Sequence, residues 1–338
     1  MKALFFKRGF IVMGLISLLG VGKIHGQQDP VFSQYMMNAY LVNPAIAGSG
    51  GFTEFCLTAR EQWVGFKGTP KTHAVCGQTR ILRNSFINKN ASVKRKHRMS
   101  SRSGRIGLGG YIFNDHTGAI GRTGFQATYA YHIDLHSSQL SFGVSMKAYQ
   151  YKLNDDIIMF DEDVVFQSKD KVYFVPDANF GAYFRGYGFN GGISCSNAFR
   201  SKLRLWDPSS TIKETDDIML RTYYIMGGYT FTIDKEFGVE PSFLFKTNDI
   251  GCTQFDLNAK VYYKDDYWTG LSIRTGEKEH KLSDFIIMGG LRFDNIYFGY
   301  AFDYATSSIM AHTFGSHEFM IAVKFGDNAR RYRWLNRY

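Results

Sequence analysis

The sequence has few cysteines, few prolines and no long apolar run after its first segment, and each scarcity excludes a class of protein. The four cysteines, Cys56, Cys76, Cys195 and Cys252, are scattered and form no C-x-x-C pair, which argues against zinc and redox motifs. The nine histidines show no H-E-x-x-H or other metal-ligand spacing. No later apolar run approaches the roughly 18 residues that a membrane-spanning helix needs. The sequence thus excludes helical spans and indicates no cofactor and no metal site.

Acidic residues are outnumbered by basic ones, 30 to 40, which gives a formal net charge of +10. Lys2, Lys7 and Arg8 precede an apolar run over 9–21, and the small residue Gly26 stands before Gln27. This pattern predicts a secretory signal peptide over 1–26, without the cysteine that a lipoprotein needs. A secreted chain does not usually meet nucleic acid. We therefore expect the net positive charge to reflect binding to anionic surfaces or simply the presence of basic loops.

Aromatic residues and glycine are abundant, and long runs alternate between apolar and polar side chains. The aromatic fraction is 16%, with 35 Gly against 6 Pro, as suits many β-strands. One run alternates Phe255, Leu257 and Val261 with Asp256 and Lys260. Each run is about ten residues long, which is enough for a tilted strand to cross a bilayer and longer than usual soluble strands. We count fourteen such runs, near 52–62, 71–81, 105–114, 122–134, 138–151, 178–186, 188–195, 221–232, 237–247, 253–263, 266–275, 284–293, 295–304 and 316–325.

The lengths of the links support a closed barrel over 52–325. After even-numbered runs several links are tight, as at 135–138, 186–188 and 264–266. Most links after odd-numbered runs are longer: 63–70, 115–121, 152–177, 276–283 and 305–315. Short periplasmic turns and long external loops are typical of outer-membrane barrels. The sequence therefore predicts an all-β transmembrane barrel of about 14 antiparallel strands in a Gram-negative outer membrane, with its termini in the periplasm.

The link 82–104 is long although it follows an even-numbered run, and it contains no acidic residue. Its basic residues include Lys94, Arg95, Lys96, Arg98 and Arg102. One interpretation is a solvated charge run. The other is an electrostatic docking surface for an acidic periplasmic partner or the cell wall, shared with the basic periplasmic tail 326–338.

Cys56 and Cys76 lie on the polar faces of the first two runs, at similar distances from the turn near Gly65. Cross-strand neighbours can be within disulfide reach in an oxidising envelope. A disulfide and two free lumen-facing thiols therefore both remain open. Ser307, Ser308 and His312 share a predicted loop, but such residues are common in loops, so we predict no enzyme activity. The glycines of 107–110 lie within a strand and allow side chains or a plug to approach the wall.

Residues 27–51 alternate like neither helix nor strand. Ser33 is a candidate N-cap for helical turns over 34–40, and Asn43-Pro44 ends them. A fourteen-strand barrel has a lumen wide enough to conduct unless something fills it. The segment enters from the periplasmic side in this interpretation, with side chains that suit a polar inner wall: Phe32, Gln34, Tyr35, Asn38 and Asn43. We predict a partly helical lumen plug or a partner-facing anchor.

Two stretches resemble the PorP/SprF family. The first comprises Gln28-Asp29-Pro30, Phe32-Ser33-Gln34-Tyr35, Asn38, Asn43-Pro44-Ala45 and Ala47-Gly48. The second comprises Arg60, Gln62-Trp63, Gly65, Gly68, Pro70 and Thr72. The resemblance directs attention to Asp29, Pro30, Pro44, Arg60, Gln62 and Trp63 as further plug or partner-binding residues.

The resemblance implies an outer-membrane barrel of the type IX secretion system of Bacteroidetes-like bacteria. Such proteins serve secretion or surface attachment of cargo and, in some species, of gliding adhesins. The implied partners are periplasmic ring lipoproteins, a peptidoglycan-binding linker, secreted cargo and outer-membrane lipid. The alternative from the barrel alone is an outer-membrane channel or transporter for small or hydrophobic ligands.

Overall fold

A computed structural model describes most of the chain between Phe32 and Phe325. The described residues are 32–66, 68–81, 104–118, 120–135, 138–153, 173–203, 217–218, 220–234, 236–264, 266–276, 282–306 and 308–325. Several predicted features lie outside these residues: the signal peptide 1–26, Asp29, Pro30, Lys94, Arg95, Lys96, Arg98, Arg102 and the tail 326–338.

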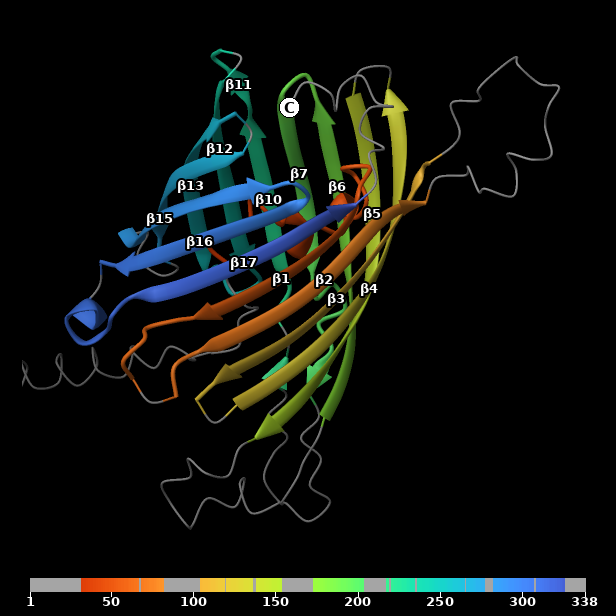
Figure 1. The fold of residues 1–338 in the computed structure, drawn as a ribbon. Helices are drawn as coiled ribbons and strands as arrows, with labels where there is room; N and C mark the ends of the chain where they lie inside the picture. Colours follow the sequence, from red (N-terminus) through yellow and green to blue (C-terminus); the bar gives the residue numbers. More distant parts are fainter. Residues whose placement is uncertain are drawn as a thin grey trace, which may run out of the picture.

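Fourteen antiparallel strands close into one barrel (Figure 1). They are β1 (Thr53–Glu61), β2 (Lys71–Ile81), β3 (Ile106–Thr117), β4 (Ile120–Leu135), β5 (Ser138–Leu153), β6 (Tyr173–Gly186), β7 (Phe189–Ser196), β10 (Thr222–Tyr229), β12 (Phe237–Asn248), β13 (Thr253–Tyr263), β14 (Tyr267–Thr275), β15 (Leu282–Phe293), β16 (Ile296–Ala305) and β17 (Ser316–Phe325). Barrel neighbours pair in chain order, and the pairs β1–β17 and β7–β10 together with β10–β12 complete the ring. The predicted barrel and its strand number are confirmed.

Three short strands stand apart from this count. The two-residue β11 (Phe231–Thr232) extends the edge of β12, whereas β8 (Lys202–Leu203) and β9 (Asp217–Ile218) pair only with each other. These three strands are not needed to close the barrel.

Two predicted strand limits are wrong, and the same physical cause explains both. The link expected at 115–121 shrinks to a tight turn at Gly118, which has φ +59°, so that Asp115 and His116 belong to β3. At the other site β6 begins at Tyr173, which pairs with Tyr151, so that residues 173–177 of the expected link 152–177 lie within the strand. In both places pairing with a neighbouring strand outweighs local loop propensity.

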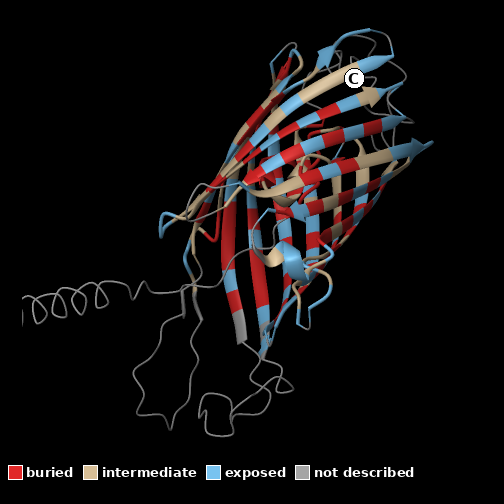
Figure 2. Cartoon of the chain, turned by 90° about the vertical axis from the view of Figure 1, so that its left-hand side faces the viewer, coloured by how far each residue is buried: buried red, intermediate tan, exposed pale blue. Residues whose placement is uncertain are grey.

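Buried and exposed residues alternate along the strands, as Figure 2 shows by its red and pale blue bands. Asp256 and Lys260 of β13 point inward and are buried, whereas Leu257 between them is half exposed on the outer face. The outward residues form the apolar surface that faces lipid in a transmembrane barrel. In the described part of the chain no helix is both long enough and apolar enough to cross a membrane.

The barrel has two distinct ends. At the Thr53 end, uppermost in Figure 1, β1 begins and β17 stops. At the Glu61 end, β1 stops and β17 begins, after a link that holds the short 3-10 helix η5 (Ser308–His312). These two names are used below.

Candidate functional site: the N-terminal segment in the lumen

Residues 32–51 lie inside the barrel and are mostly buried. Their fully or nearly fully buried members are Ser33, Gln34, Tyr35, Asn38, Tyr40, Asn43, Ala45, Ala47 and Ser49. The described segment begins near the Glu61 end, where Ser33 meets Glu318, and reaches the Thr53 end, where Gly48 meets Gln78. It therefore runs along the lumen. The predicted entry of the segment from the periplasmic side would therefore require the Glu61 end to face the periplasm.

The predicted helix over 34–40 is absent, and Ser33 does not cap one. The described segment contains only two 3-10 turns, η1 (Ala39–Leu41) and η2 (Pro44–Ile46), with Pro44 at the first position of η2. Ser33 cannot act as the cap because wall side chains engage its hydroxyl, and the wall also binds the first amide groups of the segment. The Ser33 hydroxyl donates to Asp303 Oδ2 (2.6 Å), and the amide N–H groups of Ser33 and Gln34 are bound to Glu318.

A carboxylate of β17 holds the start of the segment at the Glu61 end. The N–H of Ser33 donates to Glu318 Oε2 (2.7 Å) and the N–H of Gln34 to Glu318 Oε1 (2.9 Å). The Gln34 side chain also donates to the Glu318 carbonyl oxygen (3.1 Å). A carboxylate bound by two backbone N–H groups makes strong charge-assisted hydrogen bonds, so this contact fixes both position and direction of the chain.

Two arginines surround this contact in an almost dry cluster. Arg60 binds Asp303 (2.6 Å) and Glu318 (3.1 Å), and it also donates to the Ser33 hydroxyl. Arg274 binds Asp256 (3.0 Å) and donates to the Phe32 carbonyl oxygen (3.4 Å). The five charged side chains are no more than 6% exposed. Removing one partner from such a buried cluster leaves an uncompensated charge.

Polar side chains bind the middle of the segment to strands on different sides of the lumen. The contacts are Tyr35 with Asn258 in β13, Asn38 Nδ2 with Cys76 Sγ in β2 (3.1 Å), Tyr40 Oη with Thr128 Oγ1 in β4 (2.8 Å), and Asn43 Nδ2 with the carbonyl oxygens of Ala182 in β6 (3.0 Å) and Ile193 in β7 (3.2 Å). Burial raises the pKa of Tyr40 to about 12, so its phenol keeps its proton. These contacts cross the lumen and tie opposite walls to one chain segment.

Inward-facing glycines form the seat of the segment. A Cβ added to Gly107 would lie 1.9 Å from the Ala47 carbonyl oxygen, and one on Gly143 would lie 2.4 Å from Ala45 N. The same test at Gly181 gives 2.1 Å to Asn43 Oδ1. No side chain fits in these places, because the backbone of the segment lies against the wall. The predicted close approach at 107–110 is confirmed for Gly107, and for Gly109, whose Cβ would meet Tyr40 Oη at 2.6 Å.

A histidine that the sequence did not single out holds the other end of the segment. His132 Nε2 lies 3.0 Å from the Ala47 carbonyl oxygen, and its Nδ1 lies 2.8 Å from Ser141 Oγ. Because a carbonyl only accepts, Nε2 carries the proton and Nδ1 accepts from the hydroxyl. One residue further, the Gly48 N–H donates to Gln78 Oε1 (3.0 Å). The segment is thus anchored at both ends of its path.

Cys56 and Cys76 are directly opposite each other in the pairing of β1 with β2. Both are free thiols, buried and on the inward face, which is the second of the two alternatives considered above. The Asn38 amide covers one of them. In the described residues no group of three or more His, Cys, Asp or Glu side chains could hold a metal ion.

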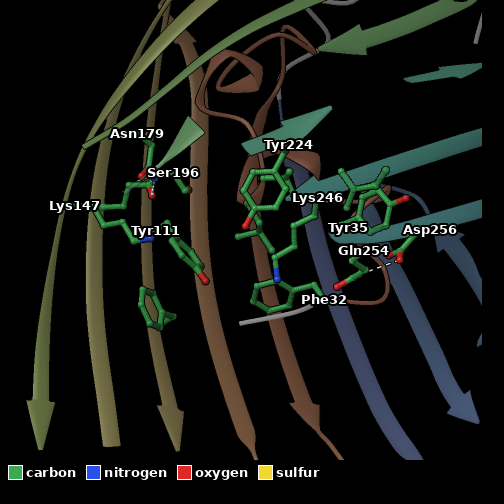
Figure 3. A pocket seen from close by; sticks show the side chains of 15 residues that line it. Phe32, Tyr35, Tyr111, Lys147, Asn179, Ser196, Tyr224, Lys246, Gln254 and Asp256 are labelled. Carbon is green, nitrogen blue, oxygen red and sulfur yellow. Dashed lines mark hydrogen bonds between the residues drawn. The ribbon is translucent and has the colours of Figure 1, made fainter. Parts of the chain in front are cut away.

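A small cavity beside the segment is lined by several side chains, among them Phe32, Tyr35, Lys147, Tyr224 and Lys246 (Figure 3). Its volume is about 60 Å³. A water needs roughly 10–15 Å³ of such volume, so the cavity holds a few waters at most. It offers no room for an organic ligand of ordinary size.

A family comparison decides what kind of protein this is. The profile of the family described as "Type IX secretion system membrane protein PorP/SprF" matches residues 24–323. The chain belongs to the PorP/SprF family. The resemblance drawn from the sequence is confirmed, and the barrel is a membrane protein of type IX secretion. No curated protein was found to match the chain.

Several solved structures are similar to this PorP/SprF barrel at very low identity. The outer membrane protein Omp33 of Acinetobacter baumannii is 7% identical, with a TM-score of 0.43 over 82% of this chain and 99% of that one. The toluene transporter TbuX of Ralstonia pickettii is 9% identical, with a TM-score of 0.46 over 89% and 95%. A mutant porin of Rh. blastica is 6% identical, with a TM-score of 0.33 over 81% and 99%.

The family-like residues at 60–72 divide between two places in the PorP/SprF barrel. Arg60 clamps the segment in the lumen, and Thr72 donates to Asp115 (2.6 Å) on the inner wall. Gln62 and Trp63, predicted to bind the plug or a partner, lie beyond the end of β1 at the rim, and their contact with a partner remains a prediction. The Gln62 N–H donates to the Pro70 carbonyl oxygen (2.9 Å), which closes the link. Only Arg60 of the predicted set from this stretch touches the segment.

Proposed function

We propose that the protein is a non-enzymatic, plugged outer-membrane barrel of the type IX secretion system. It supports secretion or surface attachment of cargo and docks periplasmic components of that system, namely the ring lipoproteins and the peptidoglycan-binding linker. The single observation that carries this proposal beyond family membership is the segment 32–51, which occupies the lumen. A barrel whose lumen is filled acts through its surfaces.

The contacts of the segment favour this function over a channel or transporter. Wall glycines bring the segment into direct contact with the barrel, and the buried arginine cluster holds the segment at one end while His132 holds it at the other. The cavity of about 60 Å³ that the described residues leave beside the segment is too small for a transported ligand. A transporter would need the segment to leave its seat, which breaks buried charge-assisted hydrogen bonds.

The proposed orientation places the Thr53 end in the periplasm. Tight connections lie at that end, where Leu135 pairs with Ser138, Gly186 with Phe189 and Phe293 with Ile296. Longer links join β7 to β10 and β16 to β17 at the Glu61 end. Short turns face the periplasm in bacterial barrels. The basic link 82–104 and the tail 326–338 then face periplasmic partners, whereas Ser33, at the start of the described segment, lies at the external end. This orientation is therefore proposed in place of the predicted entry of the segment from the periplasmic side.

Reversing the charge of Lys94, Arg95, Lys96 and Arg98 to glutamate is expected to abolish co-purification with the periplasmic partners. The physical reason is that an acidic partner attracted by this surface would be repelled. Affinity purification from detergent-solubilised envelopes, with partners identified by mass spectrometry, measures the effect. The barrel itself should remain folded, as judged by its heat-modifiable mobility in electrophoresis.

The matched control reverses charges at the other end, with Lys152→Glu and Arg200→Glu. Both side chains are exposed at the Glu61 end, so this variant should keep its periplasmic partners. If the 94–98 variant still co-purified with them at wild-type levels, the basic link would have no docking role.

A further inference from the structure

Three links at the Glu61 end are joined into one rigid rim, here called the rim platform. It comprises residues 62–66, 68–70, 118 and 308–315. The Val64 N–H donates to the Gly315 carbonyl oxygen (2.9 Å), and the Phe314 N–H donates back to Val64 (2.8 Å). On the other side the Gly118 N–H donates to the Gly68 carbonyl oxygen (3.0 Å). Backbone bonds between separate links restrict their motion, which lowers the entropy cost of binding.

The rim platform presents aromatic side chains to the exterior. Trp63 is 37% exposed, Phe66 44% and Phe314 77%. The Phe314 ring lies over Gly65, the residue between Val64 and Phe66, where an added Cβ would be 3.3 Å from the ring. Clustered exposed aromatic residues on a rigid rim are typical of a binding surface.

Trp63 has a strained backbone that the platform maintains. Its φ is +50°, in the left-handed region that favours glycine and strains other residues. The Trp63 N–H donates to Ser316 Oγ (3.2 Å), and the pairing of Val64 with 314–315 holds the next residue. Strain that the surrounding structure maintains is characteristic of functional positions.

Lipid does not account for these aromatic residues, because a polar row separates them from the apolar band. His317, Glu61, Lys71 and His116 are consecutive partners across β17, β1, β2 and β3, and all point outward. Glu61 and Lys71 form an ion pair (2.9 Å) whose side chains are about half exposed to solvent. The apolar outward residues, such as Leu57, lie on the other side of this row, toward the middle of the strands. The rim platform therefore stands beyond the lipid-facing surface.

A groove of about 380 Å³ opens beside the aromatic residues. Val64 and Phe66 form an apolar side, and Glu61, Lys71 and His116 line the polar side. The Lys71 ammonium is paired with Glu61 and has further N–H donors for a second carboxylate. This volume accommodates a few amino-acid side chains. The combination matches a peptide that carries an apolar side chain next to an acidic one.

We propose that the rim platform binds a segment of a secreted polypeptide in which an aromatic or aliphatic residue adjoins Asp or Glu. The apolar side chain packs between Phe66 and Phe314, and the carboxylate meets Lys71 and His116. This inference deepens the proposed function, on which it rests for the external orientation of the Glu61 end. It assigns cargo contact to the rim and leaves periplasmic docking to the opposite end.

Photo-crosslinking in living cells tests the proposal. With p-benzoylphenylalanine at position 314, we expect an adduct with a secreted polypeptide, cross-linked within a segment that joins an apolar residue to Asp or Glu. The same probe at position 193, on the outer wall of β7, should give no protein adduct. Lys71→Glu should reduce the adduct at 314 roughly tenfold, the factor that corresponds to about 1.4 kcal/mol.

Matched substitutions separate the platform from general effects at the same end. Trp63→Ala should reduce the adduct, whereas Phe199→Ser, at an exposed aromatic residue outside the platform, should leave it unchanged. Adducts with lipid alone, with a periplasmic protein, or of unchanged yield in Lys71→Glu would overturn the proposal. Trp63→Ala should still co-purify with the periplasmic partners. If the wild-type protein itself did not co-purify with any of them, that result would refute the proposed function and not the rim proposal.

Discussion

Replacing Arg60 with alanine is expected to destabilise the folded barrel by about 3–5 kcal/mol, because it leaves Asp303 and Glu318 buried without their nearest cation. It also removes the donor to the Ser33 hydroxyl, so the start of the segment loses its hold. Urea unfolding in lipid vesicles, followed by electrophoretic mobility, gives the free energy of unfolding. Limited proteolysis within 32–51 reports the release of the segment.

Lys71→Ala is the matched control for this prediction, since it breaks an ion pair on the outer rim. The Glu61–Lys71 pair is about half exposed, and such pairs contribute about 0–1 kcal/mol. If Arg60→Ala changed the free energy of unfolding no more than Lys71→Ala does, the buried cluster would not anchor the segment.

Gly107→Val is expected to lift the segment from its seat, since even a Cβ would meet the Ala47 carbonyl oxygen at 1.9 Å. Overpacking of this kind costs about 1–3 kcal/mol. That cost raises the population of the displaced segment roughly 5- to 150-fold. Maleimide labelling of Cys56 and Cys76, which are buried inside the barrel, should accelerate by that factor.

Gly110→Val supplies the control three residues along the same strand, because a Cβ at Gly110 meets nothing within 4 Å. Its labelling rate should equal that of the wild-type protein, and Cys195 and Cys252, which are partly exposed, should label alike in all variants. Equal labelling rates in Gly107→Val and Gly110→Val would show that the segment does not depend on the glycine seat.

Alternation along the strands made most of the fold predictable. A strand buried on one side and facing lipid on the other must alternate, as Leu257 does with Asp256 and Lys260, and its period does not depend on distant residues. Strand ends were less predictable. Tyr173 joins β6 only because Tyr151 of the neighbouring strand pairs with it, and nothing local to Tyr173 indicates that pairing.

Of the lumen site, only the residues of the segment itself were predictable, and not the wall residues that bind them. Its position in the lumen and its amide and aromatic side chains followed from composition and from the size of the barrel, whereas its helix did not form. The wall partners were missed because they are remote in sequence: Asp303 and Glu318 lie 270 and 285 residues from Ser33. Their inward position among apolar outward neighbours was the available signal, and it marks many residues equally.

The conductance of the purified protein in planar bilayers tests the central claim most directly. The wild-type protein should show no steady conductance, because residues 32–51 fill its lumen. Deletion of 32–47 should open stable conducting steps, with Gly110→Val remaining closed as a control. A steady open pore in the wild-type protein, unchanged by the deletion, would contradict this account and favour a channel.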